Sequence, residues 1–141
     1  MDTREFDIIV YGATGYTGRL VAEHFVREYG NSDSGPKWAM AGRSEDKLSA
    51  VREEIGASPV TPMIVADAED PASLEAMCRR AKVVISTVGP YQLYGDALVE
   101  ACVRTGTDYA DLCGEPAWMA EKIAQHHAAA QESGARICFS A

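Results

Sequence analysis

The segment that most constrains the fold is Phe6–Tyr29, where an apolar run is followed by a glycine-rich turn and then by an amphipathic pattern. Residues Ile8–Val10 are β-branched and uninterrupted by polar residues, which is typical of a strand buried on both faces of a parallel sheet. After Thr17, apolar residues recur at helical spacing, so a helix is expected to begin near Thr14 or Gly15. The segment therefore predicts a central strand, a tight turn and a helix.

Three glycines in the turn have the spacing G-x-x-G-x-x-G. Gly12 permits a tight turn, Gly15 lets the backbone approach a diphosphate, and Gly18 lets the helix pack closely on the strand. The unpaired N–H groups and the dipole at the start of a helix favour an anion there. The spacing departs from G-x-G-x-x-G and is typical of short-chain-reductase-like sites. It predicts a dinucleotide phosphate site, and the alternative is an ordinary strand-to-helix loop that binds nothing.

The composition is that of one globular domain. The chain has 141 residues, of which 47% are hydrophobic and 24% charged, enough for a real core. Its formal net charge of −8 argues against a general basic surface for nucleic acid or an anionic membrane. Residues 1–5 lack the pattern of a signal peptide, and no apolar run approaches the length of a transmembrane segment. We therefore expect a cytoplasmic protein without a transmembrane segment.

Neither the cysteines nor the histidines are spaced as metal ligands. In a reducing compartment, scattered thiols are small core residues rather than disulfides. We therefore expect no metal site, and a core position for each of the four cysteines: Cys78, Cys102, Cys113 and Cys138.

The end of the second predicted strand, Lys37–Gly42, carries a candidate phosphate ligand. In a dinucleotide fold an acidic residue at this position holds the 2′-hydroxyl of the adenosine ribose, whereas an arginine accommodates a 2′-phosphate. Arg43 offers a fork of donors, Ser44 a hydroxyl and Lys47 a second cation, so NADP is favoured over NAD. The alternatives are that Ser44 caps the helix that Gly56 closes, and that Arg43 is only a solvated charge.

A third strand, Val60–Ala66, is followed by Asp67 and Ala68. A carboxylate at this strand end borders the adenine and can accept from its exocyclic amine. An aspartate that only stabilises the turn explains the sequence equally well. Asp70 and Pro71 then have the order of an N-cap and a first helical residue.

The fourth strand, Lys82–Val88, leads directly into Gly89, Pro90 and Tyr91. In a doubly wound sheet this strand lies at the topological switch point, outside which ligands bind. Gly89 would let the backbone approach the cofactor and Pro90 would fix the loop. The alternative is ordinary Gly-Pro turn chemistry.

The remaining residues continue the alternation of helix and strand. A helix is expected over Asp96–Arg104, a strand over Asp108–Cys113, a helix over Pro116–Ser133 and a strand over Arg136–Ser140. Six strands separated by five helical segments predict an α/β fold. We expect a Rossmann-type doubly wound parallel six-stranded sheet, ordered 3-2-1-4-5-6, with right-handed crossovers and helices on both faces.

Four motifs in this order give a family resemblance: Tyr11–Gly18, Ala41–Arg43, Ser86–Tyr91 and Tyr109–Glu115. Together they cover nearly the whole chain, which resembles the amino-terminal domain of saccharopine dehydrogenase-like proteins, close to the trans-acting enoyl reductase branch. The resemblance implies NADP (NADPH) as cofactor and a carboxy-terminal substrate domain that is absent from residues 1–141. We expect little or no turnover from these residues alone.

With the resemblance, the expected cofactor-binding set extends from the glycine turn to the end of the fourth strand. Thr87 and the residues after it are expected near the nicotinamide. The full set is Gly12, Ala13, Thr14, Gly15, Tyr16, Thr17, Gly18, Arg43, Ser44, Lys47, Asp67, Ala68, Thr87, Val88, Gly89, Pro90 and Tyr91.

Catalytic residues are not assigned by the sequence. No tyrosine is followed by a lysine four residues later, which disfavours a short-chain dehydrogenase. Tyr91, Cys113 and Glu115 are candidates for bordering the substrate.

Two classes of function remain. The first is the cofactor domain of an NADPH-dependent oxidoreductase that acts on an enoyl (lipid) or imine substrate. The second is a non-catalytic dinucleotide sensor or scaffold module. The expected partners are the dinucleotide and a small-molecule or lipid-derived substrate bound through the missing domain. A homodimer is compatible with the sequence, which does not determine the oligomeric state.

Overall fold

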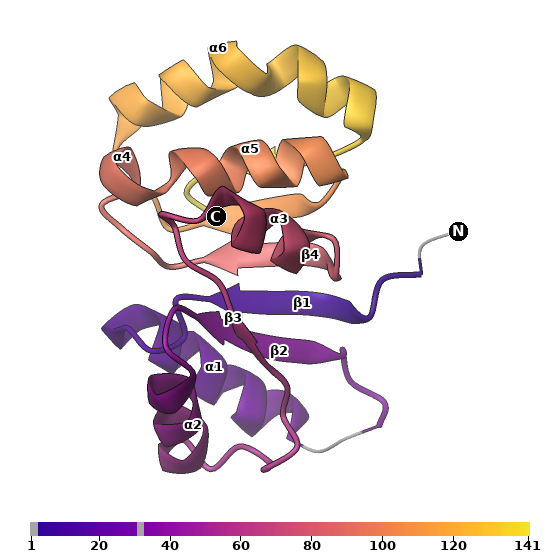
Figure 1. Cartoon of the computed structure of the whole chain (residues 1–141), viewed down its shortest axis with the longest axis vertical. Coiled ribbons are helices and arrows are strands. Elements are labelled where there is room, and N and C mark those ends of the chain that lie inside the picture. Colours follow the sequence, from indigo (N-terminus) through magenta and orange to yellow (C-terminus); the bar gives the residue numbers. More distant parts are fainter. Residues whose placement is uncertain (1–2, 31–32) are drawn as a thin grey trace.

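The first strand lies inside a six-stranded parallel sheet, in a computed structural model that describes residues 3–30 and 33–141 (Figure 1). The strand order is β3-β2-β1-β4-β5-β6, and every neighbouring pair is parallel. The predicted fold class and strand order are therefore confirmed. The elements are β1 (Phe6–Tyr11), α1 (Tyr16–Tyr29), β2 (Trp38–Gly42), α2 (Glu45–Glu54), β3 (Met63–Val65), α3 (Pro71–Cys78), β4 (Ala81–Ser86), α4 (Tyr91–Tyr94), α5 (Asp96–Thr105), β5 (Asp108–Asp111), α6 (Pro116–Ser133) and β6 (Ile137–Cys138).

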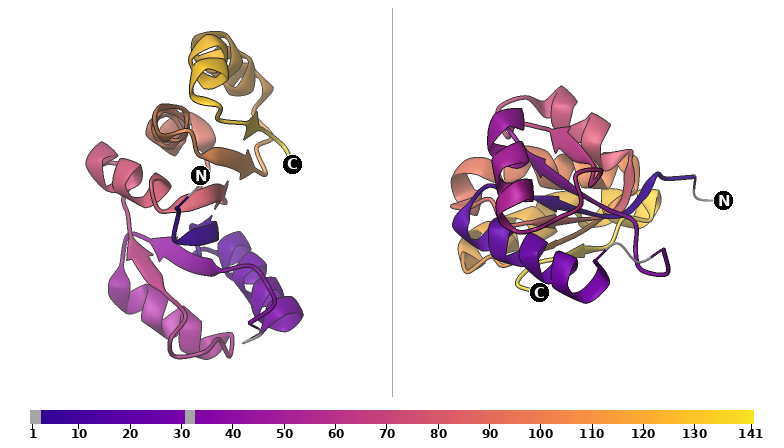
Figure 2. Two further views of the ribbon diagram at one scale, coloured as in Figure 1. Left: turned by 90° about the vertical axis from the view of Figure 1, so that its right-hand side faces the viewer. Right: turned by 90° about the horizontal axis from the view of Figure 1, so that it is seen from below.

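Helices pack on both faces of the sheet and bury two separate groups of apolar side chains (Figure 2). On one face, Phe25 of α1 and Leu48 of α2 pack with Val10 of β1. On the other face, Leu74 of α3 and Leu98 of α5 pack with Ile9, the residue before Val10. Successive residues of β1 thus enter different cores, which explains why this strand is apolar without alternation. Within the described residues, none of the helices is both long and apolar enough to cross a membrane.

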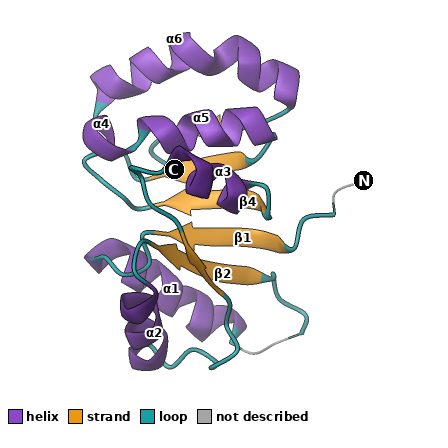
Figure 3. Cartoon of the chain, viewed as in Figure 1, coloured by secondary structure: helices purple, strands orange, loops and turns teal. Residues whose placement is uncertain are grey.

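The pairing register brings the carboxyl ends of several strands to the same end of the sheet. Tyr11, the last residue of β1, lies beside Ala41 of β2 and Ser86 of β4. Gly42 of β2 lies beside Val65 of β3. The arrowheads of β1, β2 and β4 accordingly point to the same side in Figure 3. A ligand at this end can therefore contact loops that are distant in the sequence.

The third strand is shorter than the predicted Val60–Ala66. Residues before Met63 form a turn in which the N–H of Thr61 donates to the carbonyl of Ser58 (2.9 Å), and Val60 is 84% exposed. Pairing with β2 begins only at Met63, opposite Met40. The apolar run is longer than the strand because its first residues form this turn and do not pair with the start of β2.

The last two strands are also shorter than predicted, because one carboxylate replaces the sheet ladder at their ends. Asp111 accepts the N–H groups of Cys113 and Ser140, each at 2.9 Å. These bonds draw the ends of the predicted strands Asp108–Cys113 and Arg136–Ser140 away from regular pairing. The fourth strand likewise ends at Ser86 rather than at Val88.

Within the described residues, five helical connections separate the six strands, as predicted, and the fourth of them contains two helices, because α4 forms directly after Pro90. The expectation for the cysteines holds for Cys78, Cys102 and Cys113, which are buried, and fails for Cys138, which is exposed at the open edge of the sheet.

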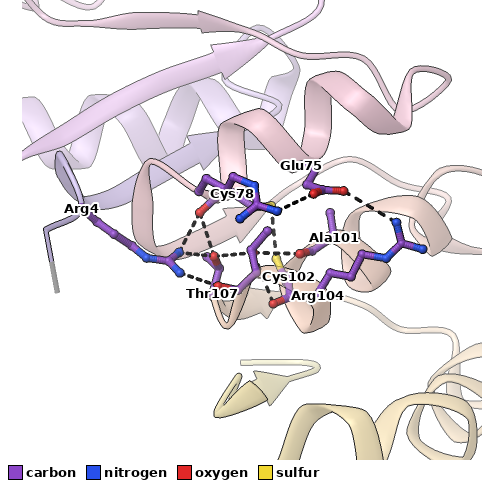
Figure 4. Close-up of polar contacts among 9 residues, drawn as sticks. Arg4, Glu75, Cys78, Ala101, Cys102, Arg104 and Thr107 are labelled. Atoms are coloured by element: carbon purple, nitrogen blue, oxygen red, sulfur yellow. Dashed lines mark hydrogen bonds and ion pairs between the residues drawn. The ribbon is translucent and has the colours of Figure 1, made fainter. Parts of the chain in front are cut away.

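Arg4 joins three segments at the end of the sheet where the strands begin, opposite the carboxyl ends of the strands (Figure 4). Its guanidinium donates to the carbonyls of Cys78 (2.9 Å) and Ala81 (2.7 Å), and also to the carbonyl of Thr105 and the hydroxyl of Thr107. Two of these carbonyls lie at the ends of α3 and α5, where helices leave acceptors unpaired. Arg4 therefore stabilises the packing of α3 and α5 against the sheet.

Candidate functional site

A crevice opens where β1, β2, β3 and β4 end, and we call it the strand-end crevice. Its volume is about 360 Å³. Its walls come from the loops after four strands, as the pairing register requires. The lining residues are Tyr11, Gly12, Thr14, Gly15, Gly42, Arg43, Asp67, Ala68, Glu69, Thr87, Val88, Gly89 and Tyr94.

The glycine turn has the geometry that the sequence predicted at its two ends. Gly12 has a φ of +90°, which a side chain would strain. A Cβ atom on Gly18 would lie 1.9 Å from the Gly12 carbonyl oxygen, so α1 packs directly on the turn. The Thr87 hydroxyl donates to the Tyr11 carbonyl (3.1 Å) and ties the turn to β4.

Gly15 differs from the other two glycines of the turn because space is open beside it. The nearest atom to a Cβ at Gly15 would be the Gly12 carbonyl oxygen at 3.5 Å, an ordinary contact. α1 begins after Gly15 without a side-chain cap. An N-terminus of this kind, exposed at a glycine, fits the diphosphate of a dinucleotide, because the amides can approach the phosphate oxygens directly.

Arg43 follows β2 at another corner of the strand-end crevice. It is exposed, and within residues 3–30 and 33–141 no hydrogen bond or ion pair engages its guanidinium. Its fork of donors is therefore available to a phosphate. Ser44 accepts the N–H of Lys47 (3.3 Å), which confirms the capping role of Ser44. Neither Ser44 nor Lys47 lines the crevice.

Asp67 stabilises the turn after β3, which is one of the two roles that the sequence left open. Its carboxylate accepts the N–H of Glu69 (3.0 Å), which stabilises the turn, and its own N–H donates to the Ser73 hydroxyl (3.0 Å). Asp67 also lines the strand-end crevice together with Glu69. The crevice therefore has carboxylates at the end of β3 and a cation at the end of β2.

Tyr11 is a buried wall of the strand-end crevice. Burial, with a further contribution from the Asp67 charge, raises the pKa of Tyr11 to about 12, while the Arg43 charge opposes the shift. The phenol is therefore neutral at physiological pH.

Several residues of the predicted cofactor-binding set do not line the crevice. Ala13 and Gly18 are buried in the packing of the turn, whereas the Tyr16 side chain is 84% exposed. The remaining ones that do not line it are Thr17, Ser44, Lys47, Pro90 and Tyr91.

Tyr91 and two other candidates for bordering a substrate make contacts inside the fold. The Tyr91 hydroxyl donates to the Ser86 carbonyl (3.2 Å), and its ring packs on Trp118. Glu115 accepts the N–H groups of Tyr91 (2.7 Å) and Gln92 (3.1 Å). The buried Cys113 sulfur accepts the N–H of Glu115 (3.3 Å). These residues connect the loop after β5 to the loop after β4.

The sequence analysis missed four lining residues: Tyr11, Gly42, Glu69 and Tyr94. Tyr11 and Gly42 are the last residues of β1 and β2, so the rule that ligands lie outside strand ends could have identified them. Glu69 lies two residues beyond the predicted Asp67. Tyr94 depends on α4, for which the sequence contains no separate signal.

A larger cavity of about 450 Å³ lies between α6 and β6. Ile123, Ile137 and Phe139 contribute apolar walls, and no residue of the predicted cofactor-binding set lines it. It is separate from the strand ends where the fold places ligands, so the smaller strand-end crevice is the candidate cofactor site.

Comparison with known proteins identifies the family of the chain. Residues 8–138 match the model of the saccharopine dehydrogenase NADP binding domain. A trans-acting enoyl reductase of Mycobacterium leprae is 53% identical over 140 residues, which cover 99% of this chain and 32% of the relative. A putative trans-acting enoyl reductase of Mycobacterium tuberculosis is 51% identical, over 95% of this chain and 31% of the relative. The chain thus spans about a third of the length of these relatives.

Solved structures share the fold at low sequence identity. Saccharopine dehydrogenase (L-Glu forming) from Saccharomyces cerevisiae aligns over 96% of this chain and 27% of its own, with a TM-score of 0.67 and 19% identity. The Citrobacter sp. triphenylmethane reductase complexed with NADP(H) aligns over 94% of this chain and 48% of its own, with a TM-score of 0.66 and 20% identity. With the match to the family model, the chain belongs to the saccharopine dehydrogenase family as an NADP-binding domain.

Proposed function

We propose that this chain is the cofactor domain of an NADPH-dependent oxidoreductase that reduces an enoyl group of a lipid-derived substrate, or an imine. The names of its half-identical relatives support the first substrate class. Bound NADPH would supply the hydride, and the protein would supply position and electrostatics. The substrate would be held mainly by a further domain.

Each part of the strand-end crevice then has a role. The amides between Gly12 and Gly18 hold the diphosphate, and Arg43 holds the 2′-phosphate. Asp67 and Ala68 border the adenine, and Thr87, Val88 and Gly89 follow the chain of the cofactor toward the nicotinamide. Only the ends of neighbouring parallel strands could bring these segments together, which supports one continuous nucleotide site.

The observation that carries the proposal is the guanidinium of Arg43, which is exposed in the strand-end crevice and unpaired within the described residues. A charge-assisted contact to a 2′-phosphate contributes about 1.5–3 kcal/mol, or roughly ten- to more than a hundredfold in affinity. The proposal therefore requires that NADPH bind more tightly than NADH.

The proposal includes a reducing compartment, the cytoplasm. The thiols of Cys78 and Cys102, whose sulfurs lie 3.6 Å apart, would stay reduced there. A homodimer is compatible with the open sheet edge at β6 and is testable by sedimentation.

Calorimetric titration of the chain with NADPH and with NADH tests the proposed function. Arg43→Ala should weaken NADPH binding at least tenfold and leave NADH binding almost unchanged. Arg27→Ala removes the same charge from an exposed position in the last turn of α1, outside the strand-end crevice, and is the matched control. Equal affinities of the wild-type chain for the two nucleotides, or equal losses of both in Arg43→Ala, would contradict the assignment of Arg43.

A further inference from the structure

We infer that Tyr94 is the aromatic wall on which the adenine base of the cofactor stacks, and that Glu115 positions it by holding α4. This inference rests on the proposed function and adds two residues to it. Tyr94 would contact the cofactor, whereas Glu115 would act only through α4.

Tyr94 has the exposure and surroundings of a stacking residue. It is the last residue of α4 and is 42% exposed. It lines the strand-end crevice with Ala68 and Val88. Within the described part of the chain, no hydrogen bond occupies its hydroxyl. An aromatic face open to a crevice is the surface that planar bases use for stacking.

The arrangement of the helices places Tyr94 at the adenine end. α3 and α5 pack side by side on one face of the sheet (Figure 2). The loop from Asp67 leads into α3, and α4 leads into α5, so both segments flank the crevice from that face. The glycine turn leads into α1, which packs on the opposite face. A base between Ala68 and Tyr94 would therefore lie across the crevice from the diphosphate amides.

Arg43 identifies the base. The proposed function assigns the 2′-phosphate to Arg43, and in NADPH this phosphate is on the ribose that carries adenine. Tyr94 flanks the crevice from the same face as Ala68, which the proposed function assigns to the adenine, so the base that it meets is adenine rather than nicotinamide. The Asp67 carboxylate in this crevice can accept from the 6-amino group.

Glu115 fixes the start of α4 although it does not line the crevice. It accepts the N–H groups of Tyr91 (2.7 Å) and Gln92 (3.1 Å), the first two residues of α4. Next to Tyr94, Gly95 is packed so closely that a Cβ there would lie 2.6 Å from the Trp118 ring. The short helix is therefore held at both ends, which fixes the direction of the Tyr94 ring.

Two ligands test the stacking: NADPH, and adenosine 2′,5′-bisphosphate, which keeps the adenine and the 2′-phosphate but lacks nicotinamide. Tyr94→Ala should weaken both by about five- to fiftyfold, because stacking of a base on an aromatic ring is lost. Tyr94→Phe keeps the ring and should stay within about twofold of wild type, a range we take as unchanged binding. Leu93→Ala is the matched control, since Leu93 is an exposed neighbour on α4 that does not line the crevice.

Three outcomes would overturn the stacking. They are unchanged binding in Tyr94→Ala, a loss for NADPH without a loss for the bisphosphate, and a loss in Tyr94→Phe equal to that in Tyr94→Ala. If wild type binds neither ligand, the proposed function itself fails. If NADPH binds and Arg43→Ala weakens it as expected, but Tyr94→Ala binds as tightly as wild type, only this inference fails.

The role of Glu115 has its own test. Glu115→Gln should weaken both ligands severalfold, although removal of a negative charge alone would strengthen the binding of an anion. In a Tyr94→Ala background, Glu115→Gln should cause little further loss, because the two residues act through one contact. Glu23→Gln removes the same charge from an exposed face of α1 and should not weaken binding. Equal losses from Glu115→Gln in both backgrounds, or no loss at all, would overturn the positioning role.

Discussion

The carbonyl oxygen of Gly12 faces Gly18 so closely that a Cβ atom at position 18 would lie 1.9 Å from it. Such a Cβ would also lie 2.5 Å from the Gly12 carbonyl carbon and 2.7 Å from the Thr87 hydroxyl oxygen. The end of β1, the first turn of α1 and the end of β4 therefore meet at a point that has no room for a methyl group. Because two of these contacts are backbone atoms, the fold cannot relieve the clash by moving a side chain.

Gly18→Ala should accordingly destabilise the fold strongly. Overpacking against backbone atoms costs about 3 kcal/mol or more. Gly15→Ala should cost no more than about 1 kcal/mol, as expected for alanine at a helix N-cap, because its Cβ meets nothing closer than 3.5 Å. Urea denaturation of the two variants measures the difference. Equal stabilities would show that α1 can shift away from the turn.

Gly15→Val separates binding from folding at the same turn. A Cβ atom fits beside Gly15 in the protein, and the branches of valine would extend into the space through which a diphosphate approaches the amides. We expect a folded variant with no measurable NADPH binding by calorimetry. A folded Gly15→Val protein with wild-type affinity for NADPH would show that the diphosphate does not bind at this turn.

Arg4→Gln should lower the stability of the fold without affecting the strand-end crevice. The substitution removes a planar fork that serves carbonyls at the ends of α3 and α5. The Cys78 carbonyl keeps the Thr107 hydroxyl as a donor, whereas the Thr105 carbonyl loses the guanidinium, and an unpaired buried acceptor costs about 1–3 kcal/mol. The expected loss in free energy of unfolding is therefore about 2 kcal/mol. Arg79→Gln is the matched control, because this exposed arginine directly follows α3 and loses only a surface ion pair to Glu75. Similar losses in the free energy of unfolding of the two variants would show that Arg4 does not stabilise the packing of α3 and α5.

The elements that the sequence predicted well are those whose signals are local. The strand, glycine turn and helix of residues 6–29 follow from burial, φ and periodicity within one segment, and the structure confirms their order. The end of β3 shows the limit of such signals. Val60 is apolar but lies outside the sheet, because the turn in which Thr61 donates to Ser58 interrupts the strand before Met63.

The candidate site was predictable in outline for the same reason. Arg43 and Asp67 follow strands directly, so the rule of strand ends located them in the crevice. Tyr91 and Glu115 were assigned toward the substrate, whereas their hydrogen bonds lie within the fold. Their contacts join segments more than 20 residues apart, and periodicity within one segment carries no information about such pairs. Tyr94 was missed for a related reason, since α4 is held by Glu115 from a distant loop.

Alkaline pH should destabilise the fold through Tyr11, in the wall of the strand-end crevice. Burial raises the pKa of this phenol from 10.0 to about 12. The folded state therefore retains a proton that the unfolded chain releases above pH 10. Stability is fully present below pH 10 and is lost as pH rises toward 12, by about 2–3 kcal/mol in total for a shift of this size. Burial and the hydrogen bond to Asp111 also raise the pKa of Tyr109, which adds to the loss in the same direction.

Tyr11→Phe has no such proton, so its free energy of unfolding, measured in urea between pH 9 and 11, should fall less steeply than that of wild type. Tyr16→Phe is the matched control, because it removes a hydroxyl from an exposed tyrosine. If Tyr11→Phe and wild type lose stability at the same rate, Tyr11 does not retain its proton in the folded state.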